Sequence, residues 1–142
     1  MEIVVGDAHG CYKQLLELMD RIGPAPTDRV ISGGDFVDRG PESPACVDFF
    51  RRQEAIMGNH EYKHVRHRCG ILKNLAPSQC QTIAQFGGIG SAAYQAAVDY
   101  MERLPFYLDL SDAIVVHAGL EYGVPLEEHD RIILVGGMSK RH

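Results

Sequence analysis

The 142-residue sequence contains no apolar run that approaches the roughly 20 residues of a membrane-spanning helix. Its amino terminus also lacks a basic stretch followed by an apolar one, the pattern of a secretory leader. No C-x-x-C pair occurs among the four cysteines, Cys11, Cys46, Cys69 and Cys80. Such dispersed cysteines are typical of small buried side chains in a reducing compartment and favour neither a disulfide framework nor a zinc site. We therefore expect a cytoplasmic protein with no membrane partner.

The sequence is also poor in positive charge, because its formal net charge is −5. An acidic chain of this kind argues against a stable nucleic-acid partner or an anionic membrane surface. Segment 63–73 is the exception, since it carries four basic residues and no acidic one: Lys63, Arg66, Arg68 and Lys73. This segment is either a solvated helix face, which is the more common case, or a secondary contact for an extended polyanionic substrate.

The composition is that of a globular protein, with 45% hydrophobic and 23% charged residues. A chain of this length can bury roughly 68–70% of its unfolded surface without disulfides. Neither an internal repeat nor a linker divides it. We expect residues 1–142 to form one domain.

Apolar runs and helical spacing alternate along the first part of the chain. Strands are predicted at residues 3–5, 30–31 and 55–57, and a fourth at residues 113–116. Apolar residues at helical spacing fill residues 11–22 before Gly23, and Ser43 with Pro44 predicts the start of a second helix. The predicted fold class is α/β with a βαβαβ start and a parallel sheet.

The later segments predict helices and further strands. Residues 78–81 resemble a capping box for a helix that stops at residues 87–88, and an Ala-rich helix follows over residues 92–104. Residues 106–108 and 113–116 form either a hairpin or successive strands, and residues 132–135 are a further candidate strand.

Each of the four predicted strands runs into residues that bind metals or handle phosphate. These motifs are residues 6–10 (GDAHG), 34–40 (GDFVDRG), 58–61 (GNHE) and 117–119 (HAG). If the strands are neighbours in one sheet, their carboxyl ends share one edge, where open α/β sheets place their ligands. The sequence then gathers five candidate metal ligands at one point: Asp7, His9, Asp35, Asn59 and His117.

The donor set indicates the kind of metal. Asp7 and His9 are two positions apart, so an extended backbone directs both side chains to one side. Asp35 supplies a second carboxylate that could bridge two ions, while an amide oxygen and two imidazoles suit Mn²⁺, Fe or Zn²⁺ better than a Ca²⁺ cage. Taken singly, an Asp, Asn or His beside glycine is commonly a turn residue. Their joint occurrence at four strand ends favours a binuclear metal site.

In this order, the four motifs resemble the signature of the calcineurin-like metallophosphoesterase superfamily. GDFVDRG and GNHE resemble most the branch that contains the Ser/Thr phosphoprotein phosphatases and the bacterial symmetrical diadenosine tetraphosphatases, and the resemblance runs from residue 1 to about residue 120. It implies the layered metallophosphoesterase fold with the metal site at the carboxyl ends of the strands. It also implies two divalent metal ions, with Mn²⁺ preferred over Fe or Zn²⁺.

The resemblance implies a role for each motif residue. Asp7 and His9 would hold the first metal, Asp35 would bridge, and Asn59 and His117 would hold the second.

Three further residues would act on the substrate. His60, paired with Asp38, would protonate the leaving oxygen, and Arg39 would bind phosphate oxygens. The alternatives are that residues 38–39 form a surface turn and that His60 belongs to an exposed helix face with His64 and His67, two residues for which we expect no catalytic role.

The implied activity is hydrolysis of a phosphoric ester, either a phosphoprotein or a small phosphomonoester, by a hydroxide generated on the binuclear centre. One alternative is a symmetrical bis(5'-nucleosyl)-tetraphosphatase, which the basic segment 63–73 favours. Another is a non-catalytic phosphate-binding domain with an incomplete metal site.

The incomplete site is a departure from the family pattern. The family usually adds a Gly-His motif beyond HAG to complete the second metal, and the 25 residues after His117 contain none; the later histidines are His129 and His142. The ligand would then be lost by truncation, supplied by another chain, or replaced by water, and we favour truncation or an unusually short member of the family. We expect a weaker second metal.

Overall fold

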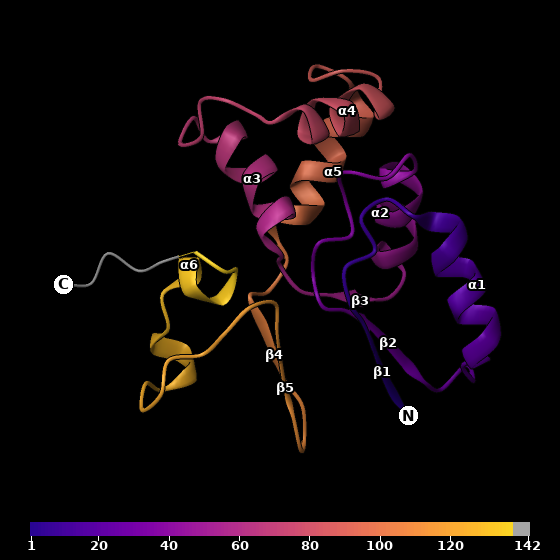
Figure 1. Ribbon diagram of the computed structural model, residues 1–142, viewed down its shortest axis with the longest axis vertical. Coiled ribbons are helices and arrows are strands. Elements are labelled where there is room, and N and C mark those ends of the chain that lie inside the picture. The colour runs from indigo at the N-terminus through magenta and orange to yellow at the C-terminus, as the bar shows by residue number, and fades with distance from the viewer. Residues whose placement is uncertain (138–142) are drawn as a thin grey trace.

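The computed structural model describes residues 1–137. Its first half is a three-stranded parallel sheet of β1 (Glu2–Val5), β2 (Arg29–Ser32) and β3 (Glu54–Ala55), in the order β1-β2-β3 (Figure 1). Helix α1 (Tyr12–Ile22) connects the first two strands, and α2 (Ser43–Arg51) connects β2 to β3. The predicted α/β class and βαβαβ start are confirmed.

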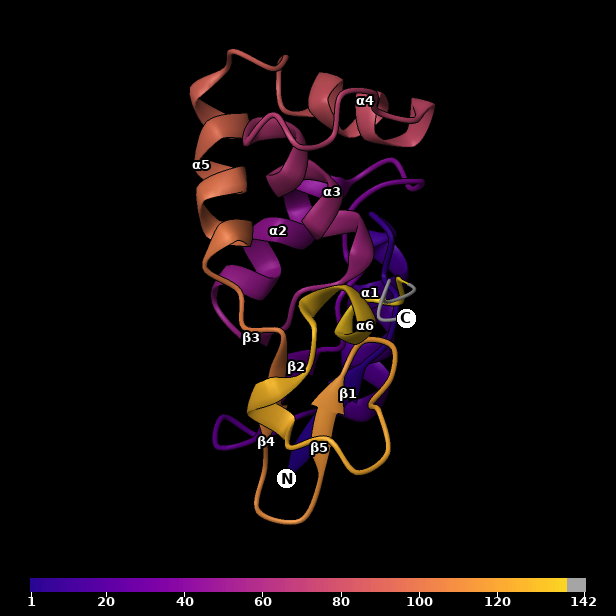
Figure 2. The ribbon, with the colours of Figure 1, turned by 90° about the vertical axis from the view of Figure 1, so that its left-hand side faces the viewer.

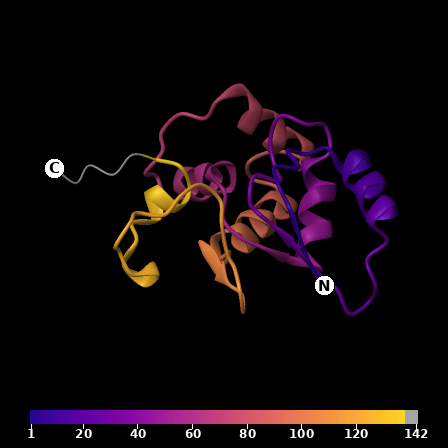
Figure 3. The same ribbon diagram turned by 60° about the horizontal axis from the view of Figure 1, so that its bottom comes forward.

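The second half is mostly helical. Helices α3 (Asn59–Arg68), α4 (Pro77–Gln85) and α5 (Ala92–Glu102) follow β3 and lie together at the end of the molecule away from the hairpin of β4 (Tyr107–Asp109) and β5 (Ile114–Val116) (Figure 2). The 3₁₀ turn η1 (Leu126–Glu128) and α6 (Arg131–Leu134) come last. The hairpin lies between this last segment and the parallel sheet (Figure 3). No helix within residues 1–137 is long and apolar enough to cross a membrane.

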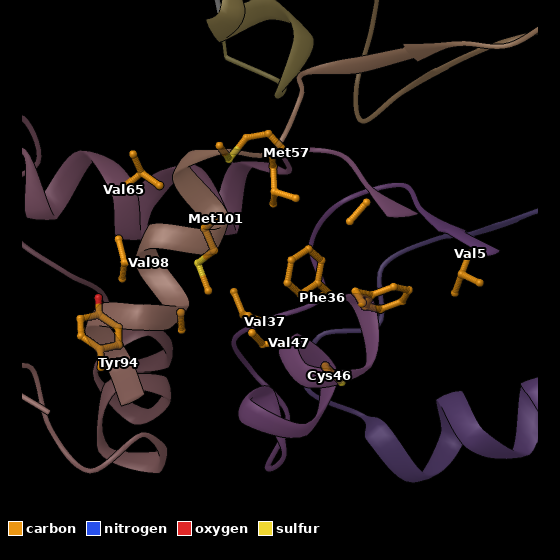
Figure 4. Close-up of a cluster of buried hydrophobic side chains, with 14 of the residues drawn as sticks. Val5, Phe36, Val37, Cys46, Val47, Met57, Val65, Tyr94, Val98 and Met101 are labelled. Atoms are coloured by element: carbon orange, nitrogen blue, oxygen red, sulfur yellow. The ribbon is translucent and has the colours of Figure 1, made fainter. Parts of the chain in front are cut away.

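The main hydrophobic core fills the space between one face of the sheet and the helices. Phe36, Val47, Tyr94 and Met101 lie within it and are almost fully buried (Figure 4). Burial of a large apolar side chain contributes about 1.5–3 kcal/mol, so this cluster fixes how the helices sit on the sheet.

A smaller cluster lies on the other face of the sheet. Ile31 and Ile56 pack there against Val115 of the hairpin. Val4 pairs with Ile31 in register but is 51% exposed, because within residues 1–137 the hairpin covers β2 and leaves this face of β1 open. β1 therefore buries one face only.

The fourth predicted strand does not join the parallel sheet. β5 pairs antiparallel with β4, with Tyr107 opposite Val116, which selects the hairpin from the two arrangements that the sequence allowed. The condition that all four strands are neighbours in one sheet is thus not met. The end of β5 nevertheless reaches the sheet edge, since His117 Nδ1 lies 2.8 Å from the carbonyl oxygen of Gly33.

The candidate strand at residues 132–135 is also wrong, because residues 131–134 form helix α6. The Asp130 side chain accepts a hydrogen bond from Ile132 N at 3.0 Å and caps the helix. Leu134 and Val135 are buried while Ile132 is 37% exposed. A short apolar run cannot be assigned to strand or helix from periodicity alone, and here the Asp cap decided the outcome.

Two predicted helix starts are shifted. Ser43 is the first residue of α2 and not its cap, because its hydroxyl accepts a hydrogen bond from Asp38 N at 3.0 Å. Helix α4 begins at Pro77, and the Gln79 side chain accepts from Ala76 N at 3.1 Å, so the capping interaction lies two residues before the predicted one. The predicted stop at residues 87–88 is confirmed, since both glycines have positive φ.

Candidate metal centre

Strained backbone marks the loops at the carboxyl ends of the strands. Four residues other than glycine have φ in the left-handed region: His9 (41°), Asp35 (55°), Asp38 (70°) and Arg39 (69°). Such conformations cost of order 1–3 kcal/mol each and tend to cluster at functional sites. All four are residues that the sequence motifs had already selected.

Two motif glycines allow these loops to approach one another. A Cβ at Gly58 would overlap the backbone nitrogen and the carboxylate of Asp35, and one at Gly40 would overlap the backbone of His9 and Gly10. Only glycine leaves room for these approaches. The glycines therefore bring together the loops that follow β1, β2 and β3.

The five predicted metal ligands converge around Asp35. His9 Nε2 lies 3.8 Å from both Asp7 Oδ2 and Asp35 Oδ2, and His117 Nε2 lies 3.4 Å from the same Asp35 oxygen. The Asn59 side-chain amide lies 3.0 Å from His117 Nε2. Candidate ligand atoms of Asp7, Asp35 and His117 all fall within 4.8 Å of one another. The Asp35 carboxylate thus faces two sets of donors at once.

Both candidate histidine ligands direct Nε2 into the centre. His9 Nδ1 lies 2.9 Å from the Val37 carbonyl oxygen, and His117 Nδ1 lies 2.8 Å from that of Gly33. A carbonyl can only accept, so each Nδ1 carries the proton and donates, leaving the Nε2 lone pair directed into the centre. The donor set fits two transition-metal ions bound to oxygen and nitrogen.

Asp35 and His117 shift each other's pKa. The interaction with Asp35 raises the pKa of His117 to about 9, although burial opposes the shift. Burial raises the pKa of Asp35, but His117 and the backbone N–H of His60 outweigh it, and the net pKa is lowered. Since a ligand imidazole must be neutral, metal binding at His117 releases a proton.

The predicted acid and its partner lie beside this centre. His60 Nδ1 lies 2.8 Å from Asp38 Oδ2, and both side chains are buried. The ring of His60 stands edge-on to that of His9, with centroids 4.7 Å apart. The alternatives of a surface turn at Asp38 and an exposed face at His60 are therefore wrong, while Arg39 is exposed.

The Asp38 carboxylate is held by four side chains from two helices. It accepts from His60 and His64 of α3 and from Gln79 and Thr82 of α4, at 2.6–2.8 Å. Burial raises the pKa of Asp38, but the hydrogen bonds from His60, His64 and Thr82 outweigh it and hold that pKa far below its usual range. Asp38 is therefore a fixed anion that orients His60.

His64 is a member of this network that the sequence reasoning missed. It is fully buried, its Nε2 lies 2.8 Å from Asp38 Oδ1, and its Nδ1 lies 2.9 Å from the Tyr94 hydroxyl. Burial raises the pKa of Tyr94 to about 12, so the phenol keeps its proton and donates to Nδ1. His64 thus accepts through Nδ1 and donates through Nε2 to Asp38. The sequence did carry a signal for this role: His64 lies four residues after His60, a spacing that places the two imidazole rings on one helix face.

We expect substitution His64→Leu to lower kcat by roughly 10–100-fold with little change in KM, as for other residues that orient a reacting group. The reason is that Asp38 would lose one of its donors and hold His60 less firmly. Steady-state kinetics measures the loss. His64→Gln is the conservative variant: its amide nitrogen can replace Nε2 as a donor to Asp38, so it should retain more of kcat than His64→Leu. His67→Leu, on the same helix outside this network, is the matched control. Equal kcat in His64→Leu and His67→Leu would contradict the positioning role.

Glu61 is a second residue whose role the sequence reasoning missed. Its buried carboxylate accepts from four backbone N–H groups, those of Asp35 (2.8 Å), Phe36 (2.9 Å), Val37 (3.2 Å) and Gly58 (3.0 Å). Burial and the nearby Asp35 carboxylate raise the pKa of Glu61 to about 7, although its hydrogen bonds favour the ionised form. Glu61 therefore ties the Asp35 loop to the start of α3, and its position three residues after Gly58 is the capping-box signal.

The later histidines do not supply the missing ligand within the described residues. His129 Nε2 accepts from Glu121 N at 2.7 Å, and His129 Nδ1 lies 2.9 Å from the Pro125 carbonyl oxygen. Both ring nitrogens therefore hold the loop that follows β5. His142 lies outside the described residues.

The fold and the site together define a metallophosphoesterase. The sequence model of the calcineurin-like phosphoesterase family matches residues 3–136, and the chain belongs to this family.

Among curated relatives, a symmetrical bis(5'-nucleosyl)-tetraphosphatase of Shewanella baltica is 32% identical over 123 residues, covering 82% of this chain and 43% of the relative. Serine/threonine-protein phosphatase 1 of Salmonella typhimurium is 29% identical over 123 residues, covering 81% of this chain and 57% of the relative. The chain thus spans less than half the length of its tetraphosphatase relative.

Solved structures confirm the fold. A crystal structure provisionally assigned to a diadenosine tetraphosphatase superposes with a TM-score of 0.68 at 22% identity, over 94% of this chain and 57% of the other. A metallophosphoesterase from Sphaerobacter thermophilus superposes with a TM-score of 0.59 at 21% identity, over 82% of this chain and 46% of the other.

Proposed function

We propose that the chain is a metal-dependent phosphoric ester hydrolase that acts on phosphoproteins or small phosphomonoesters. The observation that carries the proposal is the position of Asp35 between two sets of donors, 3.8 Å from His9 Nε2 and 3.4 Å from His117 Nε2. Asp7 and His9 would hold one divalent ion, and Asn59 and His117 the other, with Asp35 between them. We propose Mn²⁺ as the bound ion, since carboxylate oxygens suit it, although the imidazole nitrogens of the set also suit Fe or Zn²⁺.

Two bound ions would supply charge for the phosphate and lower the pKa of a coordinated water towards neutrality. The protein's own residues do the rest. His60 donates a proton to the leaving oxygen through Nε2, since Asp38 holds the Nδ1 proton 2.8 Å away and orients the ring. Exposed Arg39, next to Asp38, offers a planar fork for two phosphate oxygens.

Dinucleoside polyphosphates are the second candidate substrate class. The tetraphosphatase relative and the basic residues of α3 favour it. A non-catalytic phosphate-binding domain is the third possibility, because the proposed second donor set, within residues 1–137, is Asn59, His117 and the shared Asp35. We also propose that residues 1–142 act as one domain in the cytoplasm, where the four thiols would stay reduced.

Activity in the presence of Mn²⁺ tests the proposal. Phosphopeptide, p-nitrophenyl phosphate and diadenosine tetraphosphate separate the candidate substrates, and metal analysis should find two ions per chain. Inertness towards all three substrates, with one ion or none bound, would leave the non-catalytic domain as the better description.

The role of His60 makes a sharper prediction. We expect His60→Asn to lower kcat for a phosphoserine peptide by roughly 10²–10⁴-fold, the usual contribution of a general acid. The loss for p-nitrophenyl phosphate should be smaller, because nitrophenolate leaves without needing a proton. Kinetics on both substrates measures this difference, and an equal loss on both would argue that His60 only shapes the metal centre.

A further inference from the structure

Helix α3 has a second functional face besides the one that carries His60 and His64. Asn59, Tyr62, Lys63 and Arg66 follow the spacing i, i+3, i+4, i+7 and share one side of the helix. These four residues line a pocket of about 230 Å³, whose other wall is formed by Ile132, Val135, Gly136 and Gly137. Because Asn59 belongs to both, this α3–α6 pocket adjoins the candidate metal centre.

The four basic residues of segment 63–73 differ in whether they line the pocket and whether an acidic residue neutralises them. Arg68 lies 2.5 Å from both Asp99 and Glu102 of α5, so its charge is neutralised and it holds two helices together. Lys73 is exposed and does not line the pocket. Lys63 and Arg66 remain as the charged groups of the pocket wall, which contains no acidic residue among the eight that line it.

The two pocket cations are available to a ligand. Neither Lys63 nor Arg66 forms an ion pair with the acidic residues that the structure describes, and both are partly buried. The Arg66 guanidinium lies 5.6 Å from the centre of the Tyr62 ring, which fixes its position on the pocket wall. In a chain of net charge −5, two unneutralised cations beside a phosphate site form a local anion-binding surface.

We propose that the α3–α6 pocket binds the phosphate next to the scissile one, in a substrate that carries two or more phosphates in a row. This inference rests on the proposed phosphoesterase function and adds a specificity site to it. The helix rise of 1.5 Å per residue places Lys63 roughly 6 Å and Arg66 roughly 10 Å along the axis from Asn59. The two cations thus follow one another away from the metal centre, as the charges of a phosphate chain would. Arg66 supplies a bidentate fork and Lys63 a point charge.

Binding of inorganic tripolyphosphate to the full chain, measured by calorimetry with chelator present, tests the pocket without requiring turnover. We expect the double variant Lys63→Gln/Arg66→Gln to raise the Kd of tripolyphosphate at least tenfold, and Lys63→Gln alone to raise it by a smaller factor. Lys73→Gln removes the same charge from the same segment outside the pocket, and it should change the Kd by less than twofold.

Two outcomes would overturn the assignment. One is a double variant that folds, as judged by its melting curve, and binds tripolyphosphate as the unsubstituted chain does. The other is equal weakening in the double variant and in Lys73→Gln, which would indicate a general charge effect. Hydrolysis of p-nitrophenyl phosphate is assayed separately, so a failure of the proposed catalytic function is distinguished from a failure of the pocket.

Discussion

Substitution Asp35→Asn is expected to remove both metal ions and to lower turnover of p-nitrophenyl phosphate by roughly a thousandfold, which corresponds to about 4 kcal/mol of transition-state stabilisation. Asp35 Oδ2 lies within 3.8 Å of His9 Nε2 and 3.4 Å of His117 Nε2, so it serves both donor sets. The neutral amide removes the charge and one of the two oxygens. Metal content per chain, measured by elemental analysis beside kcat, checks the prediction.

Asp7→Asn is the matched control, because the Asp7 carboxylate is 57% exposed and, in the proposed assignment, would hold only the first ion together with His9. We expect that variant to lose one ion and keep the other. Two ions retained by Asp35→Asn, or two ions lost by Asp7→Asn, would contradict the bridging role.

Substitution Glu61→Gln is expected to destabilise the folded protein by about 3 kcal/mol, because an unsatisfied buried donor costs roughly 1–3 kcal/mol. The carboxylate accepts from four backbone N–H groups, two on each oxygen within hydrogen-bonding distance. An amide nitrogen cannot accept, so at least two of these donors would lose their partner. Urea denaturation at pH 8, above the pKa of about 7, measures the loss for the ionised side chain.

Glu102→Gln is the control for Glu61→Gln, because it makes the same chemical change at an exposed site on α5. Glu102 pairs with Arg68 at the surface, where an ion pair contributes about 0–1 kcal/mol. A loss below 1 kcal/mol in Glu61→Gln, equal to that in Glu102→Gln, would show that the four hydrogen bonds do not hold the Asp35 loop.

The first half of the fold was predictable because its signals are local. Residues 1–58 alternate short apolar runs with helical spacing, and the three parallel strands with their two helices follow from that pattern. The hairpin remained one of two alternatives, and α6 was predicted as a strand. A run of three or four apolar residues fits a strand or a helix equally well. The hairpin depended on pairing between β5 and β4, and α6 on the cap that Asp130 provides.

The residues of the candidate site were predictable for a related reason. Open α/β sheets bind ligands outside the carboxyl ends of their strands, and the candidate ligands Asp7, Asp35 and His117 stand there in short motifs with glycine that can be read from the sequence. The left-handed φ of Asp35 and the close approach at Gly58 show why the glycines accompany them. What these residues do remains a prediction for the metal and kinetic measurements.

The sequence by itself determined the family, the parallel βαβαβ start and the set of residues able to hold metal. Only the tertiary structure decided which residues surround that set. Asp38 receives hydrogen bonds from residues 22 to 44 positions away on α3 and α4, and His64 changes from an apparent surface histidine to a buried donor. The physical reason is that helix packing around Met101 and Tyr94, and not local spacing, sets which side chains meet in the interior.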